Sequence, residues 1–281
     1  MVEIIENDKN TSIELNKNEQ KISITVVINE FDTQHFGITM ATLNWSQTEN
    51  INSFNIIEMF QLLEKCINYC LSKKIKHVAL KTSTKDYKVI SALESCGFKL
   101  VNVSLGYEFD YKKQAIKTVK NSCKIRNSNL NDLEAVLNIS KNTFKNFSRF
   151  HYDEFLDDKK ADELYVKWIK NSFNGYADKI IVAEHNNEVA GFCTIKNKFT
   201  ELKGENAAGA ILAGVDEKAR GLGVYKSMLN QAVIVCSKLE NTRYLVSSTQ
   251  AQNIFVQRAW SDLGLKLYNC VYIFHKLLGE V

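Results

Sequence analysis

Residues 207–229 read AAGAILAGVDEKARGLGVYKSML, and this stretch decides the fold. Residues 208–215 are small and apolar and have the length of a buried strand. Four polar or small residues follow, and then Arg220-Gly221-Leu222-Gly223. From Leu222 onward the apolar residues have the spacing of a helix with a broad buried face. The stretch therefore predicts a strand, a glycine loop and a helix.

The glycine loop predicts a binding site for phosphate. Glycine lets the backbone come close to a ligand, and the free N–H groups at a helix start bind anions. The dinucleotide pattern GxGxxG is absent, and so is GxxxxGK(S/T), which argues against a P-loop nucleotide hydrolase. The alternative is an ordinary strand–turn–helix whose glycines only permit tight packing.

Composition limits the class of protein. A content of 45% hydrophobic and 24% charged residues in 281 positions is that of an ordinary globular protein with one large or two modest domains. A net charge of +4 is too small to indicate nucleic-acid binding. We expect no signal peptide and no membrane span. The seven cysteines form no CxxC pair, which predicts reduced thiols and a cytoplasmic location.

An internal repeat predicts two related α/β domains. Residues 85–100 (KDYKVISALESCGFKL) and 252–267 (QNIFVQRAWSDLGLKL) both begin a helix after a polar residue, end in Gly-apolar-Lys-Leu, and precede a Tyr-x-Phe strand. We place the domains at 1–115 and 116–281. Residues 45–54 contain no glycine, so the first copy lacks the phosphate loop and is predicted to be degenerate. We also expect a loop over 31–37, a helix capped by Ser53, and a closing pair of strands over 265–277.

The glycine loop resembles the pyrophosphate loop of the GNAT-family acyl-CoA N-acyltransferases. In that family a strand ends in apolar-Val-Asp, and an R/Q-x-x-G-x-G/A loop precedes a helix. The matching residues here are Val215-Asp216, Arg220 and Gly223, with Tyr225 in place of the last small residue. Further segments carry the likeness beyond the loop: HFG at 35–37, SRFH at 148–151, YxxWIxNS at 165–172 and TQxxN at 249–253. Together they resemble the dTDP-fucosamine (dTDP-4-amino-4,6-dideoxygalactose) acetyltransferase group.

This resemblance implies a fold of two GNAT-like domains and acetyl-CoA as the co-substrate, with no metal. The backbone of the strand end would bind the pantetheine arm, the loop would bind the pyrophosphate, and one asparagine would hydrogen-bond the pantetheine. The resemblance implies pantetheine contacts from the strand end at Leu212, Ala213, Gly214 and Val215. The implied pyrophosphate loop is Arg220, Gly221, Leu222, Gly223, Val224 and Tyr225, and the implied asparagine is Asn253.

Acyl transfer to an amine also needs an acid for the leaving thiolate. The resemblance implies a tyrosine in the last helix, but Trp260 stands there, and an indole N–H is no practical acid. Trp260 stays among the expected cofactor-binding residues. Three alternatives are open: the thiolate leaves with help from the loop and helix dipole, Tyr268 supplies the proton, or the domain binds CoA without turnover.

The base and the acceptor site are expected between the first two helices of the second domain. His151 is the candidate base, with a surface or packing histidine as the alternative. The predicted acceptor contacts are Arg149, Phe150, Tyr152 and His35. Trp168 has the spacing of a core residue, and His77 and His275 lie on apolar strands, where a structural role is expected.

The sequence thus predicts direct transfer of an acetyl group to a small primary amine on a nucleotide-linked deoxyamino sugar. One alternative is another amine, such as an aminoglycoside, a polyamine or a protein amine. The other is a noncatalytic acyl-CoA-binding module. An acidic pocket would favour the cationic acceptors, whereas arginine and stacking aromatics would favour the nucleotide sugar. Monomer and homodimer both stay open.

Overall fold

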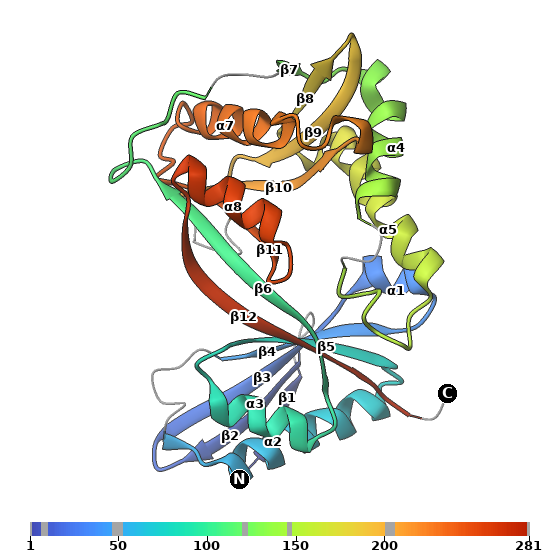
Figure 1. Ribbon diagram of the computed structural model, residues 1–281. Coiled ribbons are helices and arrows are strands. Elements are labelled where there is room, and N and C mark those ends of the chain that lie inside the picture. The colour runs from blue at the N-terminus through green and yellow to red at the C-terminus, as the bar shows by residue number, and fades with distance from the viewer. Residues whose placement is uncertain are drawn as a thin grey trace. The chain divides into compact units, whose positions relative to one another are not determined.

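The computed structural model describes residues 2–6, 11–46, 53–119, 123–144, 148–199 and 206–279 (Figure 1). The chain forms two compact units. The first comprises Met1–Val103, Arg149–Lys160 and Cys270–Val281, and the second comprises Ser104–Ser148 and Ala161–Asn269. Within the described residues, no helix has both the length and the apolar character needed to cross a membrane.

The first unit is built on a sheet in the order β1-β2-β3-β4-β5-β12. Only β4 and β5 run parallel, and every other neighbouring pair is antiparallel. The strands are β1 (Val2–Glu6), β2 (Thr11–Lys17), β3 (Gln20–Ile28), β4 (Met40–Trp45), β5 (His77–Ser83) and β12 (Lys266–Leu277).

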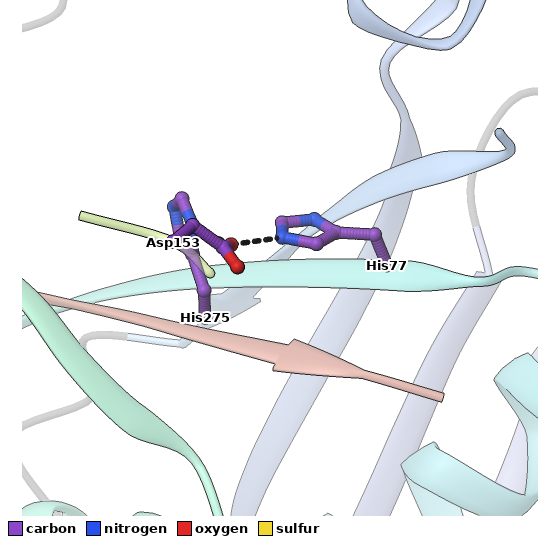
Figure 2. A group of neighbouring side chains, drawn as sticks. All are labelled: His77, Asp153 and His275. Atoms are coloured by element: carbon purple, nitrogen blue, oxygen red, sulfur yellow. Dashed lines mark hydrogen bonds and ion pairs between the residues drawn. The ribbon is translucent and has the colours of Figure 1, made fainter. Parts of the chain in front are cut away.

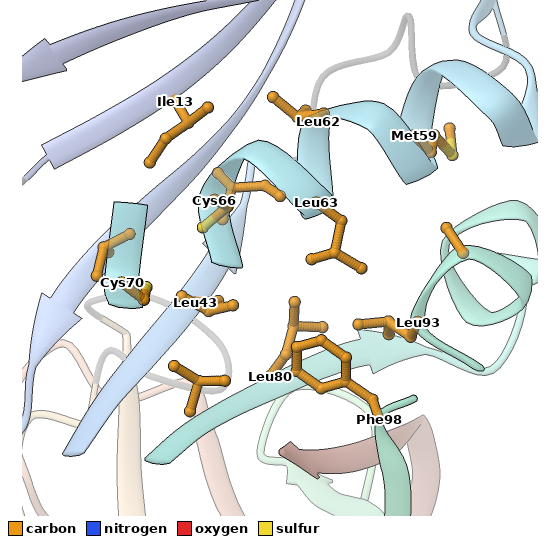
Figure 3. Packing of buried hydrophobic residues seen from close by; sticks show 14 of the residues in the cluster. Ile13, Leu43, Met59, Leu62, Leu63, Cys66, Cys70, Leu80, Leu93 and Phe98 are labelled. Atoms are coloured by element: carbon orange, nitrogen blue, oxygen red, sulfur yellow. The ribbon is translucent and has the colours of Figure 1, made fainter. Parts of the chain in front are cut away.

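Helices α2 (Ile56–Ser72) and α3 (Tyr87–Ser95) cover one face of this sheet. The apolar side chains of α2 recur at helical spacing, so one stripe of the helix is buried. Figure 3 shows Leu62, Leu63 and Cys66 of α2 packed with Ile13, Leu43 and Leu80 of the strands. These six residues are all completely buried, and they form the centre of the first unit's core.

Two local predictions in the first unit are wrong. The expected loop over 31–37 is helix α1 (Glu30–Phe36), which ends at Gly37 with φ +77° and a bond from the Gly37 N–H to the Thr33 carbonyl, 2.9 Å long. Only Gly37 breaks the helix, because residues 31–36 contain neither glycine nor proline. The cap of α2 is Asn55 rather than Ser53, because Asn55 and Glu58 bond to each other's backbone N–H groups.

The second unit repeats the same strand plan in the order β6-β11-β10-β9-β8-β7. Again one pair, β10 with β11, is parallel, and the others are antiparallel. The strands are β6 (Lys99–Asp110), β7 (Lys124–Asn127), β8 (Lys179–His185), β9 (Glu188–Lys196), β10 (Ala207–Val215) and β11 (Tyr244–Gln250). Strands β8 and β9 form a hairpin, with Asn186 and Asn187 at φ +52° and +64° in its turn.

Helices cover both faces of the second sheet. Side chains alternate along a strand, so Cys193 of β9 packs in the cluster of α7 (Val224–Cys236), and Phe192 packs in the cluster of α4 (Leu133–Thr143). The unit also contains α8 (Ile254–Leu263) and most of α5 (Asp158–Asn171). The predicted strand, glycine loop and helix are confirmed as β10, residues 216–223 and α7.

Strands β6 and β12 are exchanged between the two halves of the chain. In the second unit, β6 from the N-terminal half pairs with β11, and in the first unit, residues 271–277 of β12 pair with β5. The predicted closing pair of strands is therefore wrong, since residues 266–277 form one continuous strand. The units are discontinuous in sequence, and the proposed domain boundary between residues 115 and 116 stays a prediction.

Candidate active site

The second unit contains a cavity of about 950 Å³. Its walls come from the C-terminal ends of β10 and β11, the glycine loop, and the helices α4, α5, α7 and α8. A ligand site at the C-terminal ends of parallel strands is common in α/β proteins, because the loops that follow the strands converge there.

The cavity opens where β10 and β11 stop pairing. The two strands are in register from Ala207↔Tyr244 to Gly209↔Val246, and β10 then continues to Val215 without a partner on that side. The register between β10 and β9 also shifts between Ala210 and Ala213. A bulge turns the strand locally, so the backbone of residues 211–213 is partly exposed at the cavity.

Glycine shapes the loop after β10. Gly221 and Gly223 both have φ +78°, a conformation that strains any residue with a side chain. Helix α7 begins directly afterwards at Val224, so the N–H groups of its first turn have no partner within the helix. These N–H groups and the Arg220 guanidinium line one end of the cavity, which suits an anion.

Aromatic side chains form another part of the wall. Phe144 and Tyr165 are stacked with ring centroids 4.4 Å apart, and Trp168 lies edge-on to Tyr165 at 5.0 Å. Trp168, whose spacing predicted a core residue, lies at the cavity wall. A planar or sugar-ring ligand can pack against such a surface.

The charge of the wall has one sign. Of the described residues that line the cavity, only Arg220 and Lys226 are charged, and the lining includes no aspartate, glutamate or histidine. Lys226 Nζ lies 2.9 Å from the exposed carboxylate of Asp262. The cavity is thus better suited to anionic than to polycationic ligands.

Tyr225 and Trp260 form a hydrogen-bonded pair on the wall. The Trp260 indole N–H donates to the Tyr225 hydroxyl oxygen at 2.9 Å. Trp260 is almost completely buried and lies edge-on to Tyr107 at 5.1 Å. Burial raises the pKa of Tyr225 above its ordinary value, and the Trp260 bond opposes that rise, so the phenol is neutral at pH 7.

The structure brings most of the predicted CoA residues together at this cavity. Asn253 also lies there, and its Nδ2 donates to the Thr249 hydroxyl at 3.0 Å. Leu222 does not line the cavity and is 44% exposed. The CoA roles stay predictions. The residues at the wall are Leu212, Ala213, Gly214, Val215, Arg220, Gly221, Gly223, Val224, Tyr225, Asn253 and Trp260.

Tyr268, the predicted alternative acid, belongs to the second unit but is not part of the cavity wall. Its ring lies against Gly106 of β6, where a Cβ would come within 3.1 Å of it. Burial and the nearby Glu108 raise the pKa of Tyr268 to about 12. Its role as an acid is untested, but it is less accessible to a cavity ligand than Tyr225.

The predicted base and acceptor contacts all lie in the first unit. His35 is buried and donates from Nε2 to the Lys160 carbonyl at 2.6 Å. Phe150 is buried, with Phe36 5.5 Å from its ring and the Arg149 guanidinium 4.7 Å from it. These contacts are those of packing residues.

His151 is partly exposed, and Tyr152 is 47% exposed. These two side chains therefore retain surface for a ligand, unlike Phe150. The roles of all five residues stay predictions, because the cavity is built from the second unit alone.

A buried polar cluster lies within the first unit (Figure 2). His77 Nε2 from β5 and His275 Nδ1 from β12 each donate to Asp153 Oδ2 at 2.7 Å. Burial opposes ionisation of Asp153, but the two imidazole bonds outweigh it and lower its pKa. Burial lowers the pKa of His275 to about 4.

The cluster fastens the segment Arg149–Lys160 to two strands of the first unit. Imidazole and carboxylate are metal-ligand types, and their donor atoms lie within 4.8 Å of one another. Here the same ring nitrogens are already bonded to the carboxylate, so we interpret the cluster as an anchor. That agrees with the structural role expected for His77 and His275.

Sequence reasoning missed several cavity residues. Ser247, Ser248 and Gln250 lie on β11, where pairing with β10 has ended. Phe255 is the second residue of α8, and 83% of its surface is exposed. A phenylalanine in the first turn of a helix that follows an asparagine cap is a sequence pattern that could have indicated a ligand contact at Phe255. The loss of pairing on β11 carried none, because it depends on two strands far apart in sequence.

Comparison with known proteins finds a family match in the second half of the chain. Residues 136–265 match the Acetyltransferase (GNAT) family. The spore coat polysaccharide biosynthesis protein SpsD of Bacillus subtilis (strain 168) is 25% identical over 149 residues, which are 53% of this chain and 49% of SpsD. The match thus spans about half of that relative's length.

Solved structures share the fold over nearly the whole chain. A GCN5-related N-acetyltransferase from Sphaerobacter thermophilus has a TM-score of 0.65 at 10% identity, covering 98% of this chain and 82% of that one. A tandem GNAT protein from the clavulanic acid biosynthesis pathway has a TM-score of 0.57 at 9% identity, covering 97% and 84%. Such low identities show the fold alone. Residues 136–265 therefore match the GNAT acetyltransferase family, and the chain shares the fold of solved GNAT structures.

Proposed function

We propose that the protein transfers the acetyl group of acetyl-CoA to a primary amine of a nucleotide-linked deoxyamino sugar. The observation that carries this proposal is the cavity of the second unit, which combines an unpaired strand edge, a glycine loop suited to an anion and aromatic rings, with no carboxylate among the described residues of its wall. A pyrophosphate-containing donor and an anionic acceptor both suit a wall whose charged residues are Arg220 and Lys226.

The donor would lie along β10. The pyrophosphate binds at Arg220 and the first N–H groups of α7, and the pantetheine arm follows the exposed backbone of residues 211–213. Asn253 is oriented by its bond to Thr249, which leaves its amide oxygen to accept from a pantetheine N–H. One backbone N–H of the strand edge would polarise the thioester carbonyl.

The reaction is direct attack of the amine on the thioester carbonyl. A C–N bond forms, the C–S bond breaks, the amine gives up a proton, and the CoA thiolate takes one. His151 stays the proposed base. The described cavity wall offers no carboxylate or imidazole in its place, so the alternative is proton loss to water.

The acceptor class rests on charge and shape. Polyamines and aminoglycosides are polycations, and acidic residues usually hold them, whereas Phe144, Tyr165 and Trp168 offer rings to a sugar or a base. The relative SpsD acts in spore coat polysaccharide biosynthesis, as its name states, which is consistent with a sugar acceptor.

We further propose that the first unit is a diverged copy of the same fold. It shows the same strand plan with one parallel pair, and a solved structure of similar fold is described as a tandem GNAT protein. All seven cysteines are free thiols, which agrees with the proposed cytoplasmic location.

The test is an assay of free thiol. Purified protein is mixed with acetyl-CoA and, separately, with dTDP-, UDP- and GDP-linked amino sugars, spermidine, an aminoglycoside and a lysine peptide. We expect thiol release with at least one nucleotide sugar and an acetylated product by mass spectrometry. Preference for a polycation would overturn the acceptor, and failure to bind acetyl-CoA would overturn the whole proposal.

A further inference from the structure

We propose that Tyr225 is the general acid that protonates the leaving CoA thiolate, and that Trp260 positions it. The inference rests on the proposed function, because it presumes acyl transfer from a CoA thioester within the cavity of the second unit. It assigns the proton to a residue of α7, at the start of the helix that follows the phosphate loop.

Few described groups on the wall can serve as a general acid. Among the described lining residues these are Tyr165, Tyr225, Lys226 and Cys193, since serine and threonine hydroxyls are far weaker acids. Cys193 is almost completely buried, and its thiol is already directed at the Thr194 carbonyl, 3.8 Å away. Lys226 is held by Asp262 at 2.9 Å. The two tyrosines are left.

Tyr225 has a donor directed at its hydroxyl oxygen. An indole N–H can only donate, so the Tyr225 oxygen is the acceptor of the Trp260 bond, and the phenol's own proton is not used in it. When that proton leaves, the same N–H stabilises the phenolate. Tyr165 lies on α5, where its ring contacts Phe144 and Trp168, whereas Tyr225 directly follows the glycine loop.

The pair is held rigidly. Trp260 is 2% exposed and is packed edge-on against Tyr107, so its N–H has a fixed direction. Tyr225 lies on the first turn of α7, two residues after Gly223. The first turn of α7, residues 211–213 and Tyr225 all line the same cavity, so one donor bound there can contact all three.

The proton transfer balances without another co-reactant. As the tetrahedral intermediate collapses, the C–S electron pair goes to sulfur, the Tyr225 O–H proton goes to the same sulfur, and CoA leaves as the free thiol. The phenolate, bonded to the Trp260 N–H, regains a proton from solvent, and the amine's proton has already gone to the base.

The first test compares tyrosine-to-phenylalanine variants. Tyr225→Phe should lower kcat by about 100-fold, as loss of a general acid does, with the dissociation constant of acetyl-CoA unchanged within twofold by calorimetry. Tyr176→Phe, an exposed position away from the cavity, is the matched control and should leave kcat unchanged. Loss at Tyr268→Phe instead of Tyr225→Phe would overturn the assignment, as would a Tyr225→Phe enzyme with more than a third of the wild-type kcat.

The second test keeps the hydroxyl and changes its acidity. Trifluorotyrosine placed at position 225 should introduce a fall in kcat at alkaline pH, at the pKa of the fluorinated phenol, where the wild type shows none. Trp260→Phe in that background should move the fall to higher pH, because the phenolate has lost its N–H donor. A purely structural role for Trp260 would not move it, and a profile without the fall would overturn the proposal.

Hydroxylamine serves as the acceptor in these assays, because it is small enough to need no acceptor recognition. If the wild type acetylates hydroxylamine over the uncatalysed background but no amino sugar, the acceptor class is wrong and the Tyr225 comparison is still decided. If Tyr225→Phe matches the wild type with hydroxylamine, the acid assignment fails while acyl transfer stands.

Discussion

The two units share a strand plan but differ at their single parallel pair. In the first unit, β4 and β5 pair from Met40↔His77 to Leu43↔Leu80, and Leu43 and Leu80 are completely buried. In the second unit, pairing of β10 with β11 stops at Gly209↔Val246, and a cavity follows. Where the second unit's parallel strands part, a cavity replaces the packed core, and the backbone groups of the unpaired strand have no other strand to bond.

The buried polar groups differ in the same way. The first unit buries a carboxylate between two imidazoles, and these contacts hold a segment in place. The second unit directs its polar groups, Arg220, Tyr225 and Asn253, into the cavity wall. Four predictions test this division between a structural and a chemical unit.

The largest effect should come from cutting the chain between residues 115 and 116. The fragment 116–281 lacks β6, so β11 loses its antiparallel partner and the core loses Tyr107 and Phe109. We expect it to show no cooperative unfolding transition by circular dichroism. The matched fragment 104–281 keeps residues 104–110 and should show one. A stable 116–281 fragment would mean that the exchanged strand is dispensable.

Next in size is acid sensitivity confined to the first unit. The pKa of His275 is about 4 in the fold against an ordinary value of 6.5. Below 6.5 the unfolded chain binds a proton that the folded chain excludes, so stability falls until pH 4, by about 3 kcal/mol in total. Urea unfolding at pH 7, 5.5 and 4.5, followed by hydrogen exchange, measures this loss, which should appear in peptides of the first unit.

His275→Asn keeps an N–H donor for Asp153 but cannot titrate, so its stability should depend less steeply on pH over the same range. His185→Gln, in the second unit, is the control and should keep the wild-type slope. Equal acid sensitivity in both units would show that the His275 cluster does not set it.

Third is the phosphate loop. Arg220→Ala should weaken acetyl-CoA binding by about tenfold to a hundredfold, since a charge-assisted bond to phosphate is lost. Binding of S-acetylpantetheine, which has no phosphate, should be unchanged. Arg258→Ala, on the exposed side of α8, is the control. If Arg220→Ala weakens both donors equally, its role is not phosphate binding.

Much of the second unit followed from local pattern. The small apolar run, the glycines at 221 and 223, and the helix over 254–263 each carry their signal within a few residues. The exchange of β6 and β12 could not be predicted from the sequence. Both strands have the same alternation of side chains, so the pattern of each fits the first sheet as well as the second. The hydrogen bond between Trp260 and Tyr225 joins two residues that are 35 positions apart in sequence and lie on different helices. No local sequence pattern predicts such a contact. Helix α1 was missed because it is only seven residues long.

The smallest expected effect concerns His151, which belongs to the first unit. If it is the base, His151→Gln should lower kcat by about tenfold at acid pH, where the amine is most protonated, and less at alkaline pH, with acetyl-CoA affinity unchanged. His185→Gln is again the control for loss of a partly exposed imidazole. An unchanged pH–rate profile would confine the chemistry to the second unit and leave the first with a structural role. The expected profile would show that the division between the units is incomplete. A residue of the packed unit would then take part in the reaction.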